Sequence, residues 1–153
     1  MPAVAPIVDV DTAARLRAAI GRLHRRLRPT SAGAQAGLTP TRISILQTVV
    51  RGGPIRLSEL TDAEGVNPTM LSRVVADLGD AGLLDRVSDP DDRRAALVQA
   101  TPEGRRLSER MRRERTDVLS RALASLPATE LAKLERALPA LERLAEALKE
   151  QRS

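Results

Sequence analysis

Apolar residues recur every three or four positions through most of the chain, with charged and polar residues between them. This is the period of an amphipathic helix. The first apolar stripe belongs to a helix predicted from residue 11 to about residue 28, and its members are Leu16, Ile20, Leu23 and Leu27. Similar stripes predict about five more helices, at residues 40–52, 57–64, 68–81, 102–126 and 128–148. Residues 29–37 (PTSAGAQAG) are predicted to form a loop because of their composition.

Two of these predicted helices are short and are joined by a tight turn. Gly65 stands where the chain must reverse, and glycine adopts the left-handed conformation at the least cost. Asn67 and Pro68 then restart the helix, with a capping side chain followed by proline at the first helical position. The apolar face of the second helix comprises Leu71, Val74, Val75 and Leu78. This pattern is typical of a helix-turn-helix whose second helix enters the major groove of DNA.

A predicted β-hairpin follows the helix-turn-helix directly. The segments LLDRVS and AALVQA have the composition of short strands, and DPDDRR between them is rich in turn-forming residues. Residues 54–56 are predicted to add a third short strand beside this hairpin. A hairpin in this place is the wing of a winged helix.

These segments together resemble the MarR-type winged-helix transcriptional regulators. The resemblance rests on RLSEL, on NPTMLSRVVADLGDAGLLDR and, most specifically, on DPDDRRAALVQATPEG, and it extends over residues 12–148. The sequence departs from the family pattern at Thr61, where alanine is usual, and at Ala100, where leucine is usual. Both are small packing changes. The resemblance implies a mainly α, α+β winged helix-turn-helix fold.

The length of the chain, 153 residues, is that of one domain. The resemblance implies a single MarR-like domain over residues 1–153. Within it, residues 38–100 would form the winged-helix DNA-binding lobe, and residues 1–37 and 101–153 would supply dimerisation helices. The last helix supports this assignment because its near-heptad stripe needs another surface to cover it; the stripe comprises Leu131, Leu134, Leu138, Leu141, Leu144 and Leu148. Pro139 lies inside that helix and is predicted to kink it.

By resemblance, the function is that of a ligand-responsive repressor that binds a pseudo-palindromic operator in double-stranded DNA as a homodimer. The side chains implied to face the major groove are Pro68, Thr69, Ser72 and Arg73. At the wing tip, Arg94 would enter the minor groove, with Asp92 orienting it and Arg93 near a phosphate. The alternative for these wing residues is a surface ion pair that only stabilises the hairpin, which would contribute little.

The resemblance also implies a small-molecule effector, often an anionic aromatic compound, bound between the dimerisation helices and the DNA-binding lobe. Candidate contacts are His24, Arg28 and Arg86. The effector would favour a dimer whose half-site separation no longer matches the groove repeat of DNA. The chain has no cysteine, so oxidation sensing through a thiol is excluded.

Charge leaves two other classes of function open. The chain carries a net charge of +5, yet residues 38–104 hold 7 basic and 10 acidic side chains. The basic flanking helices would supply long-range attraction to phosphate, or they are simply solvated helix faces. The acidic balance of the lobe is the best support for a winged helix that binds proteins instead of specific DNA. A third reading is an architectural DNA-binding protein without an effector.

Other chemistry is excluded or disfavoured by the residues themselves. Because the chain has no aromatic residue, base-stacking recognition of single-stranded nucleic acid is disfavoured. The only histidine is His24, no nucleophile elbow or phosphate-binding glycine motif occurs, and the Asp89–Ala100 segment lacks the glycine and glutamate of a calcium loop. We therefore expect no enzyme activity, no metal and no cofactor. With no apolar run long enough for a membrane span and no signal peptide, we expect a cytoplasmic protein.

Overall fold

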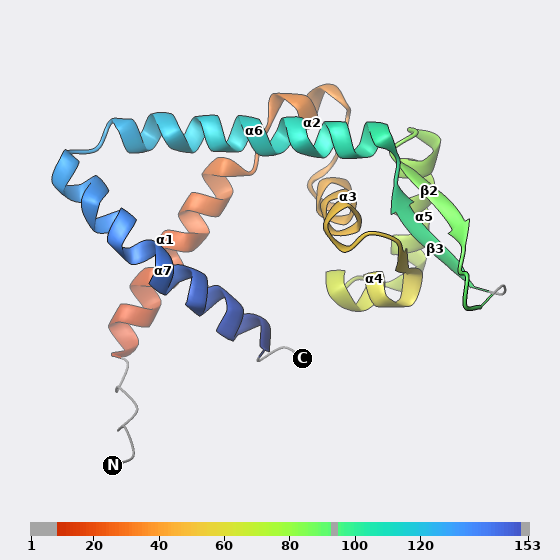
Figure 1. Cartoon of the computed structure of the whole chain (residues 1–153), viewed down its shortest axis with the longest axis horizontal. Coiled ribbons are helices and arrows are strands. Elements are labelled where there is room, and N and C mark those ends of the chain that lie inside the picture. Colours follow the sequence, from red (N-terminus) through yellow and green to blue (C-terminus); the bar gives the residue numbers. More distant parts are fainter. Residues whose placement is uncertain (1–8, 93–94, 151–153) are drawn as a thin grey trace, which may run out of the picture. The chain divides into compact units, whose positions relative to one another are not determined.

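The structure is a computed structural model that describes residues 9–92 and 95–150 of the chain, without the side chain of Lys149. Seven helices and three strands lie within these residues (Figure 1). Their order is α1 Val10–Leu27, α2 Ser31–Gln35, α3 Pro40–Gly52, β1 Ile55–Arg56, α4 Leu57–Glu64, α5 Pro68–Asp80, β2 Leu84–Ser88, β3 Ala96–Ala100, α6 Pro102–Ala124 and α7 Ala128–Glu150. The mainly helical winged-helix fold predicted from the sequence is confirmed.

One helix was not predicted. Residues 29–37 were expected to form a loop, and this expectation is wrong because Ser31–Gln35 is helical. The first two backbone N–H groups of α2, at Ser31 and Ala32, donate hydrogen bonds to the carboxylate of Glu114 on α6, at 2.6 and 3.0 Å. A carboxylate at a helix N-terminus satisfies donors that the helix itself leaves open. Glu114 is more than 80 residues away in sequence, so local composition could not reveal the contact.

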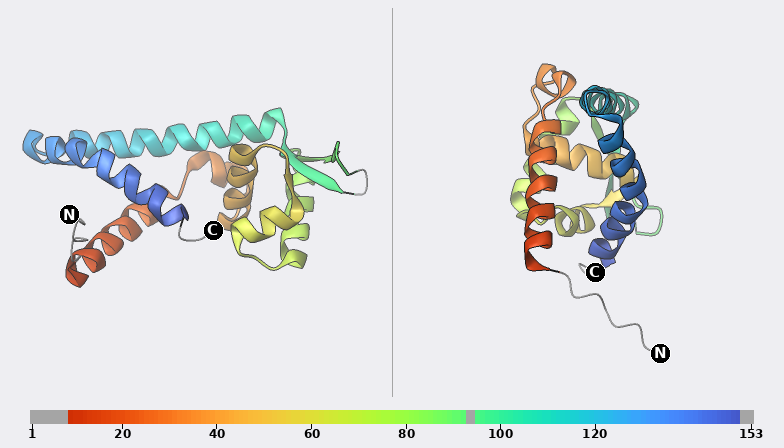
Figure 2. Two further views of the ribbon diagram at one scale, coloured as in Figure 1. Left: turned by 60° about the horizontal axis from the view of Figure 1, so that its bottom comes forward. Right: turned by 90° about the vertical axis from the view of Figure 1, so that its left-hand side faces the viewer.

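The sheet is small and antiparallel, with strand order β1-β3-β2. Strands β2 and β3 pair from Leu84 opposite Ala100 to Ser88 opposite Ala96 and form the wing hairpin. At the other edge, Arg56 on β1 pairs with Leu97 on β3, which confirms the predicted third strand. In Figures 1 and 2 the hairpin projects beside α5.

The core of the winged-helix lobe is built from aliphatic side chains and one methionine. It lies where α3, α4, α5, the sheet and the first half of α6 meet, and its fully buried members are Ile45, Leu46, Val49, Leu60, Leu71, Val75, Leu78, Leu84, Val98, Leu107 and Met111. Gly104 allows α6 to approach the turn between α5 and β2 closely. A Cβ atom at Gly104 would lie 2.1 Å from the carbonyl oxygen of Leu83, so any other residue would force the backbone apart.

The chain divides into two compact units, Met1–Arg115 and Thr116–Ser153, and the boundary falls inside α6. The second unit consists of the end of α6 and of α7, which continues past Pro139 to Glu150. The kink expected at this proline stays a prediction. No helix among residues 9–92 and 95–150 combines the length and apolar character needed to cross a membrane.

Candidate nucleic-acid interface

The turn between α4 and α5 has the conformation that the sequence predicts. Gly65 adopts a left-handed backbone (φ 62°), and its N–H donates to the carbonyl of Thr61 at 2.9 Å. Asn67 is extended, and its side-chain oxygen accepts a hydrogen bond from the N–H of Thr69 at 2.8 Å. Pro68 occupies the first position of α5. Local chemistry therefore fixes where α5 begins and how the chain enters it.

Helix α5 separates an apolar face from a polar one. Leu71, Val75 and Leu78 are buried in the lobe. On the other side Pro68, Thr69 and Arg73 are exposed, and Ser72 is half-buried. The four residues predicted to face the major groove thus come from the first turn and a half of one capped helix. Their contact with DNA stays a prediction.

Polar contacts from α3 hold both helices of the helix-turn-helix. Arg42 on α3 forms an ion pair with Asp77 on α5. The hydroxyl of Ser44 donates to the carboxylate of Glu64 at the end of α4, at 2.9 Å, and the hydroxyl of Thr48 donates to the same carboxylate. These contacts tie α3 to both helices of the helix-turn-helix. They could not be predicted from the sequence because the partners lie 16 to 35 residues apart.

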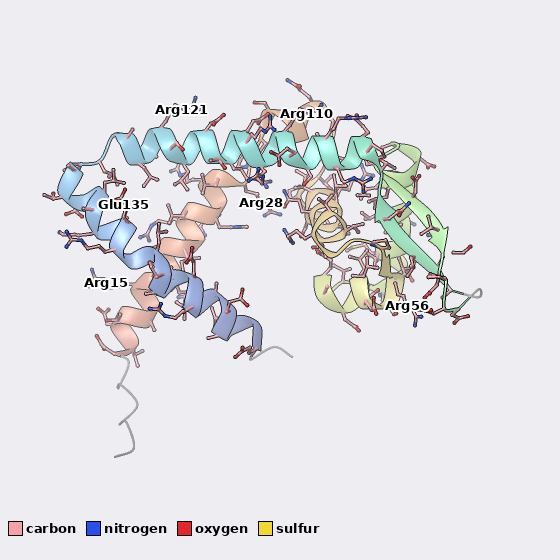
Figure 3. All side chains as sticks on the ribbon, viewed as in Figure 1. Arg15, Arg28, Arg56, Arg110, Arg121 and Glu135 are labelled. Carbon is pink, nitrogen blue, oxygen red and sulfur yellow. The ribbon has the colours of Figure 1, made fainter. Side chains whose placement is uncertain are left out.

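An ion pair joins β1 to the turn of the wing hairpin. The Nε and Nη2 atoms of Arg56 on β1 lie 2.8 and 2.6 Å from Oδ2 of Asp89, which follows β2. Asp89 is buried, and its Oδ1 accepts a hydrogen bond from the N–H of Asp91 at 2.9 Å. The Asp91 hydrogen bond and then the Arg56 guanidinium lower the pKa of Asp89, and the Asp89 carboxylate raises the pKa of Arg56. Figure 3 labels Arg56 beside the sheet.

The Arg56–Asp89 pair was not predicted. Asp92 was expected to orient a wing arginine, and the structure adds Asp89 as a buried carboxylate of the wing. A signal was present, because Asp followed by Pro and Asp favours a turn in which the first Asp bonds the backbone two residues on. The backbone carbonyl of Asp92 accepts from the N–H of Ala95 at 2.9 Å. Arg93 and Arg94 lie outside the described residues, so their roles, and that of Asp92, stay predictions.

The acidic balance of the lobe is partly internal. Several of its carboxylates have partners within the lobe. Glu59 and Glu64 accept hydrogen bonds, and Asp77 and Asp89 form ion pairs. By contrast, the side chain of Arg73 is exposed on the polar face of α5. Because Arg42 and Arg56, the partners of Asp77 and Asp89, belong to the same residues 38–104, this pairing leaves their net charge negative.

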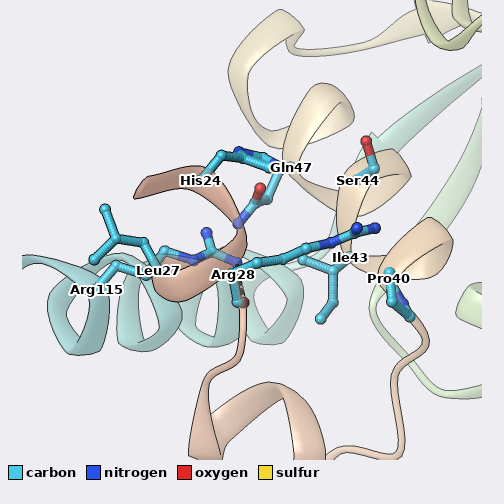
Figure 4. A pocket seen from close by; sticks show the side chains of 8 residues that line it. All are labelled: His24, Leu27, Arg28, Pro40, Ile43, Ser44, Gln47 and Arg115. Carbon is cyan, nitrogen blue, oxygen red and sulfur yellow. Dashed lines mark hydrogen bonds between the residues drawn. The ribbon is translucent and has the colours of Figure 1, made fainter. Parts of the chain in front are cut away.

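A pocket of about 440 Å³ lies between α1, α3 and the middle of α6 (Figure 4). It is lined by His24, Leu27, Arg28, Pro40, Ile43, Ser44, Gln47 and Arg115. Nη2 of Arg115 lies 3.5 Å from the backbone carbonyl of Arg28, and burial lowers the pKa of Arg115. The pocket brings together His24 and Arg28 from the predicted ligand site, but Arg86 lies on β2 and does not line it. Arg115 was not predicted.

Comparisons with known proteins agree with this architecture. The MarR family model matches residues 38–96. An HTH-type transcriptional regulator of Mycobacterium tuberculosis is 34% identical over 122 residues, which cover 80% of this chain and 84% of the relative. The crystal structure of a transcriptional regulator from Thermotoga maritima superposes with a TM-score of 0.78 at 25% identity, over 93% of this chain and 99% of that one. NadR, solved in complex with 4-hydroxyphenylacetate, has a TM-score of 0.59 at 22% identity, over 92% and 97% of the two chains.

Proposed function

Because the chain belongs to the MarR family of transcriptional regulators, we propose that this DNA-binding winged-helix protein is a ligand-responsive repressor. It binds a pseudo-palindromic operator as a homodimer and acts in the cytoplasm without enzymatic activity. The capped helix α5 carries this proposal. It presents Pro68, Thr69, Ser72 and Arg73 at one end of a helix whose opposite face is fixed in the core.

The DNA contacts divide between α5, which serves as the recognition helix, and the wing. Thr69, Ser72 and Arg73 read base edges or phosphates in the major groove, where each base pair presents a distinct pattern of donors and acceptors. Arg94 at the wing tip enters the neighbouring minor groove and reads its width, with Asp92 orienting it and Arg93 near a phosphate. The wing hairpin beside α5 supports this division.

Apolar side chains on the terminal helices support the homodimer. Helix α1 has no buried residue, and Ile20 and Leu23 are exposed on it. Helix α7 exposes a leucine stripe made of Leu134, Leu138, Leu141, Leu144 and Leu148. Stripes of this kind are covered in solution by another apolar surface. We propose that residues 1–37 and 101–153 pair with those of a second copy, and that the two lobes then read two half-sites.

The pocket beside α3 supports an anionic effector. Arg28, Arg115 and His24 supply positive or proton-donating groups, and Leu27 and Ile43 supply apolar surface. An aromatic carboxylate matches both kinds of lining. NadR was solved with such a compound. Because α3 also holds α4 and α5 through Ser44 and Arg42, a ligand here can bias the helix-turn-helix.

Selection of binding sites from random duplexes by the full-length chain, followed by footprinting, tests the central proposal. We expect a short pseudo-palindrome with two half-sites about one helical turn apart. Uniform, strongly salt-dependent binding with no selected sequence would instead indicate an architectural protein. The absence of DNA binding would indicate a protein-interaction module.

Titration with 4-hydroxyphenylacetate tests the effector. Binding should raise the melting temperature and weaken affinity for the selected duplex together, because linkage ties the two equilibria. The variant to compare with wild type is Arg115→Met, because it removes a pocket cation and leaves the contacts between α3 and the helix-turn-helix in place. A compound that binds wild type without changing DNA affinity would contradict regulation through this pocket.

A further inference from the structure

Arg56 joins three elements that have different tasks in DNA recognition. It is the residue before α4, the first helix of the helix-turn-helix, and its own N–H donates to the carboxylate of Glu59 at 3.2 Å. Its backbone pairs with Leu97 on the wing strand β3. Its side chain binds Asp89 on the other side of the wing hairpin. One residue therefore connects the helix-turn-helix to both strands of the wing.

The geometry of the Arg56–Asp89 contact restricts rotation of the wing. The Nε–H of Arg56 donates to Oδ2 of Asp89 at 2.8 Å, and its Nη2 atom forms an ion-pair contact with the same oxygen at 2.6 Å. The second oxygen of Asp89 is bound by the N–H of Asp91 and cannot turn away without losing that bond. Because two atoms of one planar group meet the same oxygen, the contact restricts the direction of the guanidinium as well as its distance. A lysine would keep the charge but would offer only one nitrogen atom.

The burial of the two partners differs, and the difference indicates what the pair does. The side chain of Asp89 is 5% exposed, whereas that of Arg56 is 45% exposed. The exposed arginine keeps much of its contact with water, whereas the buried carboxylate depends on its hydrogen bonds and on the arginine, so removing Arg56 should also cost some stability. Neither residue belongs to the buried apolar core of the lobe. The pair therefore lies at the edge of the lobe, where it joins the turn of the wing to β1.

We propose that Arg56 and Asp89 are positioning residues for DNA recognition. Their ion pair holds the wing at the angle to α4 and α5 that lets the wing tip and the recognition helix engage the same duplex. This inference rests on the proposed two-part reading of DNA. Neither residue needs to touch DNA for the device to work, since a displaced wing loses its contact while α5 keeps its own.

The test compares four single variants with wild type in the full-length chain. Arg56→Met removes the guanidinium, Arg56→Lys keeps only its charge, and Asp89→Asn keeps the shape of the carboxyl group. The matched control is Arg51→Met, which removes the same charge from the exposed end of α3. Thermal unfolding reports on folding, and binding-site selection reports separately on the inner half-sites and the outer flanks.

We expect Arg56→Met and Asp89→Asn to lower operator affinity about tenfold, the order of one lost minor-groove contact. Preference at the outer flanks should vanish while preference within each half-site persists. Arg56→Lys should recover part of the affinity, and Arg51→Met should behave as wild type. Unchanged flank preference in folded Arg56→Met and Arg56→Lys would overturn the inference.

A double variant separates positioning from direct contact with DNA. If Arg56 acts through the wing, Arg56→Met combined with Arg94→Ala should cost no more affinity than the larger single loss. Additive losses would mean that Arg56 contacts DNA by itself, and the positioning role would be wrong. If Arg94→Ala alone changes nothing while wild type selects a palindrome, the wing reads no DNA and the inference falls. If wild type selects no sequence, the proposed function fails first, and this inference fails with it.

Discussion

The winged-helix lobe buries its apolar residues, whereas helices α1 and α7 leave theirs at the surface. On α5, Leu71 and Leu78 are fully buried. On α7, Leu138 and Leu148 are each 52% exposed. Both helices carry leucines at the same helical spacing, so the local pattern is alike in the two regions. The difference is whether other elements of the chain cover the apolar stripe of the helix.

This contrast separates two sources of stability. The lobe has a continuous core and needs no second molecule to complete it. Helices α1 and α7 leave large apolar side chains exposed, and the stability of helices in proteins comes mostly from the packing of an apolar face. Their stability should therefore depend on association and on protein concentration. Substitutions in the two regions should therefore differ in kind, with the largest effect in the core of the lobe.

Leu78→Ala should have the largest effect because it empties part of the lobe core. We expect a loss of about 2–5 kcal/mol in the free energy of unfolding, the range for deleting a buried leucine side chain. Because the core lies within one chain, this loss should not change with protein concentration. Urea unfolding at two concentrations that differ a hundredfold measures both quantities, and a strongly concentration-dependent loss would contradict an independent lobe.

Leu138→Asp combined with Leu141→Asp should break association instead. A carboxylate buried in an apolar interface is costly, so the dimer should weaken by roughly 100-fold or more. Operator affinity should fall with it, since one half-site offers half of the contacts. Analytical ultracentrifugation and circular dichroism measure association and folding of the lobe. A well-folded wild-type monomer at micromolar concentration would refute the dimer.

The features that could be predicted from the sequence are those whose causes lie within a few residues. Gly65, Asn67 and Pro68 fix the turn and the start of α5 through local backbone preferences and one side-chain cap. The wing hairpin and the short strand β1 follow from composition and turn residues. The first helix begins at Val10 with Asp9 as its cap, close to the expected start at residue 11.

The features that could not be predicted depend on partners far away in the sequence. Helix α2 is capped by Glu114 on α6. The turn of the wing is tied to β1 by Arg56 and Asp89, which are 33 residues apart. Arg115 enters the pocket only because α6 passes beside α1 and α3. No periodicity or motif encodes such contacts, because they arise only once the helices have packed.

Arg73→Ala and Arg94→Ala should each cost about 1–3 kcal/mol of operator affinity, but they should fail differently. In Arg73→Ala, base preference within each half-site should flatten if the arginine contacts a guanine edge. If the arginine contacts phosphate instead, the salt slope of binding should fall by about one. In Arg94→Ala, base preference at the flanks should be lost, and Asp92→Ala should reproduce part of that loss. Binding-site selection with the three variants measures this. Unchanged flanks in Arg94→Ala would reduce the wing to a structural hairpin.

The smallest effect should come from an exposed group of ion pairs on α6, because no buried apolar side chain is removed there. Glu109 accepts hydrogen bonds from Arg112 and Arg113. These contacts lower its pKa to about 2, and the bond from Arg112 has the larger effect. Because its pKa in the folded state is depressed, the ionised carboxylate stabilises the protein above its ordinary pKa of 4.5, and this contribution is lost as the pH falls toward about 2.

Glu109→Gln should therefore lower the melting temperature near neutral pH by only about 1 °C, since the pair is exposed to solvent. The difference from wild type should shrink steadily between pH 4.5 and pH 2, where wild-type Glu109 also becomes neutral. Glu135→Gln removes a carboxylate from α7 and serves as the matched control. Melting curves recorded at several pH values decide the matter. If the difference between Glu109→Gln and wild type stayed constant down to pH 2, the two arginines would not be stabilising the ionised carboxylate, and the ion pairs of α6 would contribute nothing measurable to the fold.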